Sequence, residues 1–216
     1  MEFYYLLFYD SLPRVNNFLQ NILSRQAYFI KEHTGIFKAA NNYDVFDAAS
    51  GEPLLECREE DLGIFTKLLR FTGAKTLTPF CSTVRTVGGQ HVMTIRRGVS
   101  FLFSDVEVLD ESGQRIGMFK QRFSIIRGKF DVMDADNNFL CELRGNWTSW
   151  GFKFLHGEEE LAIIQKQWAG LAKELFTTAD NYVLEIYPTT PKNVSVRALM
   201  LSAVLCVDFV FKERSN

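Results

Sequence analysis

The segment VSVRALMLSAVLCVDFVF, residues 194–211, decides the fold of this chain. Two serines and two charged residues, Arg197 and Asp208, interrupt its apolar run, so a helix formed here is hydrophobic on every side and must be buried in protein or in lipid. At about 1.5 Å per residue it would span roughly 27 Å, close to the thickness of a bilayer's hydrocarbon core, so length leaves both environments open. The uncharged stretch between the two charges, residues 198–207, is short for a membrane span, and a central aspartate costs about 2.5 to 3.5 kcal/mol on insertion scales. The segment therefore favours a helix buried in protein over one that spans a membrane.

A strand–turn–strand pattern recurs in the chain before this helix. The first copy, residues 43–56, places an acidic turn ending in Gly51 between two segments rich in apolar residues. Similar copies occupy residues 106–119, 130–143 and, more weakly, 151–164. Turns rich in Asp, Asn and Gly between such segments are typical of β-hairpins, and their repetition indicates a regular antiparallel β architecture. Further strands are expected at residues 28–31, 92–96 and 182–187, and short helices at 17–27 and 59–71.

The hairpins and the helix fit together as one barrel. A row of hairpins has two exposed edges, and closing the row removes them, but a wide barrel then needs a filling, which an all-round apolar helix supplies. No low-complexity linker divides the 216 residues, whose 47% hydrophobic content is sufficient for one core. We predict a single mainly β domain, a closed antiparallel barrel around a central hydrophobic helix at about 194–211. Residues 1–15 are expected to form an N-terminal extension and residues 16–213 the barrel domain.

Composition narrows the partners and the compartment. The formal net charge of -2 provides no bulk attraction for nucleic acid, so no such partner is expected, and binding to an anionic surface would require a local basic patch. The four cysteines have neither the paired spacing of a metal site nor the density of a secreted disulfide scaffold. The apolar first residues include Glu2 and Asp10 and lack a basic start, which is not typical of a signal peptide. We expect a cytoplasmic protein, or one peripheral at a membrane.

The sequence gives little support for catalysis. The three histidines lie in unrelated segments, and no nucleophile elbow, zinc-protease motif or phosphate-binding loop is present. Asp47, Asp110 and Asp134 recur in turns, where aspartate bonds its own backbone, and this accounts for them better than a carboxylate site does. The three tryptophans are more typical of packing than of ligand stacking. We expect no enzyme activity, no cofactor and no metal site.

Basic residues on consecutive predicted strands provide a candidate lipid-binding site. Its predicted members are Arg96, Arg97, Lys120, Arg122, Arg127 and Lys129. Residues i and i+2 of a strand point to one face, so neighbouring strands could gather these side chains into a patch that holds lipid phosphates through bidentate arginine contacts. The plainer alternative, which the pattern favours, is a solvated strand face that protects the sheet from aggregation.

Short motifs in a fixed order carry a family resemblance. They are TG at 34–35, NYDV at 42–45, IG at 116–117 with Gln121, KQWAG at 166–170, ADNY at 179–182, IYP at 186–188 and VDFVFKE at 207–213. Together they resemble the phospholipid scramblase family, which shares the Tubby C-terminal-like fold with the tubby proteins and the plant LURP-one-related proteins. The similarity extends from about Phe18 to Glu213. It implies a twelve-stranded barrel wrapped around the final helix.

The resemblance also implies a function, with two departures. Animal scramblases carry clustered cysteines and, between the last strand and the helix, an aspartate-rich calcium-binding stretch, whereas this chain has isolated cysteines and YPTTPKN at 187–193, without a carboxylate. Calcium needs about six to eight oxygen ligands, so no calcium site is expected. The implied function is a non-catalytic, membrane-lipid-associated binding module with anionic phospholipid headgroups as partners and a possible part in phospholipid scrambling. The alternatives are a soluble protein-interaction or regulatory barrel and, least favoured, an enzyme with an unrecognised pocket.

Overall fold

A computed structural model describes residues 17–33, 42–59, 79–98, 105–122, 127–146, 151–166 and 181–212. The expected N-terminal extension, nearly all of the helix expected at 59–71 and the three tryptophans lie outside these described residues.

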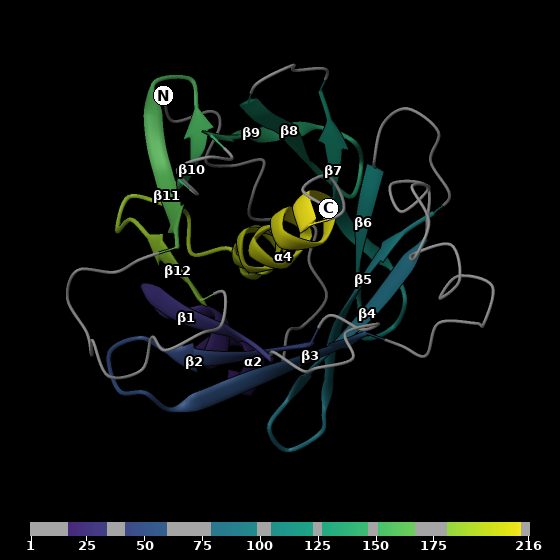
Figure 1. Ribbon diagram of the computed structural model, residues 1–216, viewed down its shortest axis with the longest axis vertical. Coiled ribbons are helices and arrows are strands. Elements are labelled where there is room, and N and C mark those ends of the chain that lie inside the picture. The colour runs from purple at the N-terminus through teal and green to yellow at the C-terminus, as the bar shows by residue number, and fades with distance from the viewer. Residues whose placement is uncertain are drawn as a thin grey trace.

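Twelve antiparallel strands form a closed barrel. They pair in chain order, and the barrel closes where β12 pairs with β1, with Tyr28 opposite Leu184. Figure 1 shows the strands as a ring around the C-terminal helix. The strands are β1 (Ala27–Glu32), β2 (Asn42–Asp47), β3 (Pro53–Glu59), β4 (Phe80–Thr86), β5 (His91–Arg97), β6 (Asp105–Asp110), β7 (Arg115–Gln121), β8 (Arg127–Asp134), β9 (Phe139–Asn146), β10 (Gly151–His156), β11 (Glu159–Gln165) and β12 (Asn181–Ile186). The predicted closed barrel is confirmed.

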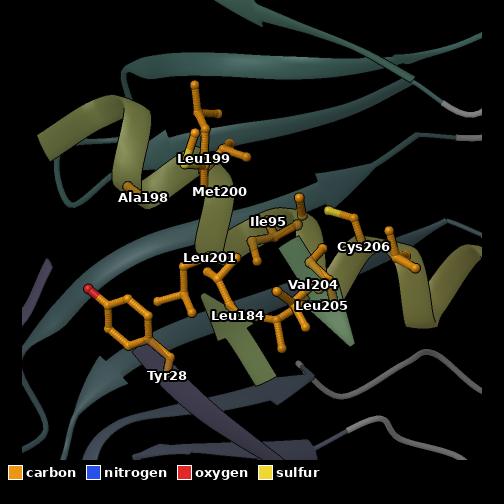
Figure 2. Packing of buried hydrophobic residues seen from close by; sticks show 14 of the residues in the cluster. Tyr28, Ile95, Leu184, Ala198, Leu199, Met200, Leu201, Val204, Leu205 and Cys206 are labelled. Atoms are coloured by element: carbon orange, nitrogen blue, oxygen red, sulfur yellow. The ribbon is translucent and has the colours of Figure 1, made fainter. Parts of the chain in front are cut away.

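The α-helix α4 (Val194–Lys212) fills the barrel. Leu199, Leu201 and Leu205 are almost completely buried against inward-facing residues of the wall, as Figure 2 shows. The side-chain oxygen of Asn193 accepts the backbone N–H groups of Ser195 at 2.9 Å and Val196 at 3.2 Å, so it caps the helix at its first turn. The prediction of a protein-buried helix is confirmed. In the part of the chain that the structure describes, no helix combines the length and the apolarity needed to cross a membrane.

One glycine allows the helix to approach the wall closely. A Cβ atom added to Gly117 of β7 would lie 2.4 Å from the carbonyl oxygen of Met133 and 2.7 Å from Cδ1 of Leu199. Ordinary carbon contacts are about 3.5 to 4.0 Å, so only glycine fits between the helix and β8 at this point. The close approach therefore fixes the position of α4 against β7.

The short helix α2 (Asn17–Leu23) lies against α4 at the end of the barrel where β1 begins. The buried hydroxyl of Tyr28, an inward-facing residue of β1, donates a hydrogen bond to the carbonyl oxygen of Ile22 at 2.9 Å. The helix is shorter than the predicted 17–27 because β1 begins at Ala27.

The acidic turns behave as predicted. The carboxylate of Asp110 accepts the backbone N–H groups of Ser112 and Gln114, each at 2.9 Å. Asp134 accepts those of Asp136 at 2.9 Å and Asn138 at 2.8 Å. Asp47 does the same two and three residues further on. These carboxylates serve their own turns, as aspartate typically does, and they lie in separate hairpins.

Candidate functional site

The structure removes Arg97 from the predicted surface patch. Its side chain is 2% exposed and its guanidinium lies 4.9 Å from the centre of the Phe80 ring. Arg96, its neighbour in β5, is exposed, because consecutive residues of a strand point to opposite faces. The expectation that both arginines face a membrane surface is therefore wrong for Arg97.

Arg96 and Lys120 face outward, each opposite a carboxylate. Arg96 donates to Oε2 of Glu107 from Nε at 2.9 Å and lies directly opposite Glu107 in the sheet. Lys120 lies between Asp105 on one side and Asp131 on the other. The outer face of β5 to β8 is thus mixed in charge. This agrees with the alternative in which the basic residues lie on a solvated strand face.

A continuous line of positive charge follows the outer face of β7 to β10. We define the cationic row as Arg122, Lys129, Arg144 and Lys153. The backbone N–H of Arg122 donates to the carbonyl of Lys129 at 2.8 Å, Lys129 lies opposite Arg144, and Arg144 lies opposite Lys153. Their side chains are 62%, 36%, 49% and 47% exposed in that order. Because facing residues of antiparallel strands have Cβ atoms about 4.5 to 5.5 Å apart, these cations form one compact line.

Sequence reasoning found two members of this row and missed the other two. Arg122 and Lys129 were predicted from their i, i+2 partners, whereas Arg144 and Lys153 lie on neighbouring strands and join the row only through the pairing of β8, β9 and β10. Arg144 and Lys153 each occupy an outward position in one of two consecutive predicted strands, and that position is the sequence signal by which they could have been found. The side chain of Arg127 lies outside the described part of the chain.

Each member of the cationic row pairs with a carboxylate. Nε of Arg122 donates to Asp131 at 2.6 Å. Lys129 and Arg144 both contact Glu142, and Lys153 contacts Glu160. The side chains of Asp131 and Glu142 are only 10% and 14% exposed, so the positive groups form the outer layer. Four cations against three carboxylates leave an excess of one positive charge.

Glu142 remains ionised in this arrangement. Partial burial raises the pKa of its carboxyl group, but hydrogen bonds from Lys129 and Arg144 outweigh that effect and hold the pKa below its ordinary value. At neutral pH the carboxylate therefore keeps its charge and cancels part of the repulsion between its two neighbours. The arrangement presents arginine and lysine N–H donors on its outer side, which is the chemistry that recognises anions.

The other reactive side chains of the described residues do not assemble into a catalytic site. His33 contacts Asp44, His91 contacts Thr94, and His156 contacts the backbone of Leu140, each on a different part of the barrel. Burial raises the pKa of the Cys57 and Cys141 thiols to about 12, so they are not thiolates at neutral pH. Among the described residues, no three His, Cys, Asp or Glu side chains gather as a metal site would require.

Comparison with known proteins identifies the family. Residues 11–214 match the family model described as Scramblase. Phospholipid scramblase family member 5 of Homo sapiens is 26% identical, over 63% of this chain and 58% of its own length. Altered inheritance rate of mitochondria protein 25 of Saccharomyces cerevisiae is 23% identical, over 90% of this chain and 71% of its own length. Phospholipid scramblase 4 of Homo sapiens is 23% identical, over 91% of this chain and 62% of its own length.

A solved structure supports the fold. The X-ray structure of a protein from Arabidopsis thaliana superposes with a TM-score of 0.54 at 16% identity, over 88% of this chain and 95% of that one. The barrel fold expected from the motifs is thereby confirmed. The chain spans 46% to 71% of the length of the first four curated relatives. With a family model that matches nearly its whole length, the chain belongs to the Scramblase family.

Proposed function

We propose that this chain is a scramblase-related, lipid-associated module that binds anionic membrane surfaces peripherally and catalyses no covalent reaction. The observation that carries the proposal is the cationic row, four exposed basic side chains adjacent to one another across β7 to β10. Lys120 and Arg127 lie on strands of the row, and Arg96 lies on β5, two strands away from β7. Phospholipid scramblases among the relatives make a lipid headgroup the first candidate for the bound anion.

The size and chemistry of the row suit several headgroups at once. Neighbouring strands lie about 4.8 Å apart, so the row is roughly 14 Å long and presents its charges along one line. Each arginine has five N–H donors, so Arg122 and Arg144 can keep their carboxylate contacts and still donate to a phosphate oxygen. The phosphate therefore adds to the existing ion pairs and need not break them.

The expected affinity is modest and sensitive to salt. A basic residue near an anionic surface contributes about 1 kcal/mol, but the carboxylates under the row cancel part of that attraction. Exposed charges are also screened beyond about 8 to 10 Å at physiological ionic strength. We expect binding at low salt that weakens strongly as salt is added.

The filled barrel determines the proposed mode of association. Since α4 occupies the interior with its apolar side chains, the helix is committed to the core of the protein. We therefore propose attachment by the outer surface and no passage of lipid through the barrel.

Flotation with vesicles tests the proposal. Phosphatidylserine-containing vesicles at low and high salt are compared for the parent and two variants of equal net charge. The first variant combines Arg122→Gln, Arg144→Gln and Lys153→Gln. The control combines Lys31→Gln, Arg85→Gln and Lys192→Gln, which are also exposed cations but lie outside the row.

We expect the parent and the control to float at low salt and the row variant to stay in solution. High salt should release the parent and the control from the vesicles. Equal binding by the row variant would show that the row is not the contact surface. If the parent bound at neither salt concentration, the lipid function itself would be rejected. The alternative, a soluble protein-interaction barrel, would then be preferred, and the ion pairs of the row would be a purely structural feature.

A further inference from the structure

A buried arginine with unused hydrogen-bond donors lies at the end of the barrel where β1 begins. Arg197, in the first turn of α4, is 1% exposed. Its Nη1 donates to the carbonyl oxygen of Arg25, just before β1, at 2.9 Å. Its Nε and Nη2 atoms are buried and have no hydrogen-bond partner among the residues that the structure describes. A charged group of this kind is costly to bury unless a counter-charge reaches it.

The two unused nitrogens define the shape of the missing partner. Nε–H and one N–H of Nη2 point in the same direction along one edge of the planar guanidinium group. This edge binds two oxygen atoms of a carboxylate or phosphate through parallel hydrogen bonds. The opposite part of the group is already engaged by the Arg25 carbonyl, so the free edge matches an oxyanion better than a spherical ion.

The surrounding described residues provide no counter-charge. Asp47, the buried carboxylate at this end of the barrel, is paired with Nε of Arg25 at 3.2 Å and accepts the backbone N–H groups of its own turn. Tyr28 lies near Arg197, but burial raises the pKa of its hydroxyl far above neutrality, so it stays uncharged. Arg197 itself remains protonated, because burial lowers its pKa from a very high ordinary value.

The helix adds a second source of positive potential. Side chains of a helix lean toward its N-terminus, so the Arg197 guanidinium lies near the positive end of the dipole of a 19-residue helix. Asn193 satisfies two backbone N–H groups there through its neutral amide oxygen, which does not compensate the charge. Helix N-termini bind anions for this reason.

We propose that the end of the barrel between α2 and the first turn of α4 holds a small oxyanion, a carboxylate or a phosphate, bound side-on by Nε and Nη2 of Arg197. The site is inside the wall, and its proposal does not depend on lipid binding by the cationic row. Because the arginine is almost inaccessible, the anion enters and leaves only when this end of the barrel opens. Its presence therefore stabilises the folded state.

Thermal unfolding of the full chain tests this site. Sodium phosphate and sodium formate are each titrated at constant ionic strength against sodium chloride, for the parent, Arg197→Met and Arg197→Lys. A single-site ligand at about 100 times its dissociation constant raises the melting temperature of a chain this long by about 5 to 10 °C. We expect a saturable rise of this kind in the parent and no saturable rise in either variant. The lysine variant keeps the positive charge but lacks the two parallel N–H donors of the guanidinium edge.

The phosphate and formate titrations together identify the ligand class, because the melting temperature can rise with phosphate alone, with formate alone or with both. General salting effects are linear and equal in the variants, so they do not imitate saturation. If neither variant folds, calorimetric binding of phosphate or formate to the parent takes the place of the comparison. The absence of saturable behaviour in the parent with both anions would overturn the proposal. So would an equal rise in Arg197→Met.

Discussion

Gly117→Ala should destabilise the barrel by forcing apart its wall and the helix inside it. The added methyl carbon would lie 2.4 Å from the Met133 carbonyl oxygen and 2.7 and 2.9 Å from the two terminal methyls of Leu199. The carbonyl belongs to the backbone of a paired strand, and Leu199 is 1% exposed, so neither can move freely. Overpacking of this kind costs about 1 to 3 kcal/mol, or about 2 to 12 °C in melting temperature.

Gly151→Ala is the matched control. It is also a strand glycine, but an added Cβ would have nothing within 4 Å. Alanine is favoured over glycine inside a strand by about 0.5 to 1 kcal/mol, so this variant should be neutral or slightly more stable. Urea unfolding of both variants measures the difference, and equal stability would refute the assigned close approach.

A double-mutant cycle identifies the helix as the obstacle. Leu199→Ala alone should cost about 2 to 5 kcal/mol through the cavity that it leaves. In the double variant the added methyl at position 117 can occupy part of that cavity. The loss of unfolding free energy in the double variant should therefore be at least about 0.5 kcal/mol smaller than the sum of the losses in the two single variants. Strict additivity would show that the Met133 carbonyl alone opposes the methyl group.

Three further results are expected. Removing residues 194–216 should abolish cooperative unfolding, because ten buried apolar side chains of α4 are lost. The larger of these side chains contribute about 1.5 to 3 kcal/mol each to stability. A soluble fragment with a cooperative melt would contradict this expectation. Calcium should leave the melting temperature unchanged, since residues 187–193 contain no carboxylate, and sub-millimolar binding by calorimetry would show otherwise. Burial raises the pKa of Asp44, but hydrogen bonds from Arg58 and His33 outweigh it and hold the pKa below its ordinary value. The carboxylate therefore stabilises the fold fully above about pH 4, and this stabilisation is lost as the pH falls through the folded-state pKa. The urea midpoints of the parent and of Asp44→Asn should then converge in acid. A difference between the two midpoints that does not change with pH would refute the assignment.

Local sequence patterns predicted most of the fold. The apolar run of α4 and eleven of the twelve strands were recognisable because alternation, acidic turns and glycines are local signals. The exception is β4, in which Ser82, Thr83 and Thr86 are buried although they are polar. A strand with polar residues on its buried positions lacks the alternation by which a strand is recognised.

The candidate site was less predictable because it depends on pairing between strands. Arg97 was assigned to the surface from its position beside Arg96, although adjacent strand residues point to opposite faces. Arg144 and Lys153 meet only in the register of β9 and β10, and β10 is shifted against β11 between Phe154 and Leu155. Register of this kind is fixed by turns and bulges across the whole sheet.

The order of the elements also affects how the protein is made. A ribosome adds about 5 to 20 residues per second, and all twelve strands emerge before α4 does. Until then the inward residues, such as Phe152 and Phe154, have no helix to pack against, and β1 can meet β12 only across more than 150 residues of chain. Such distant pairing is slow, and exposed apolar strands aggregate in the meantime. Nascent chains of this protein therefore keep apolar strands exposed until the helix has been released and the barrel can close around it.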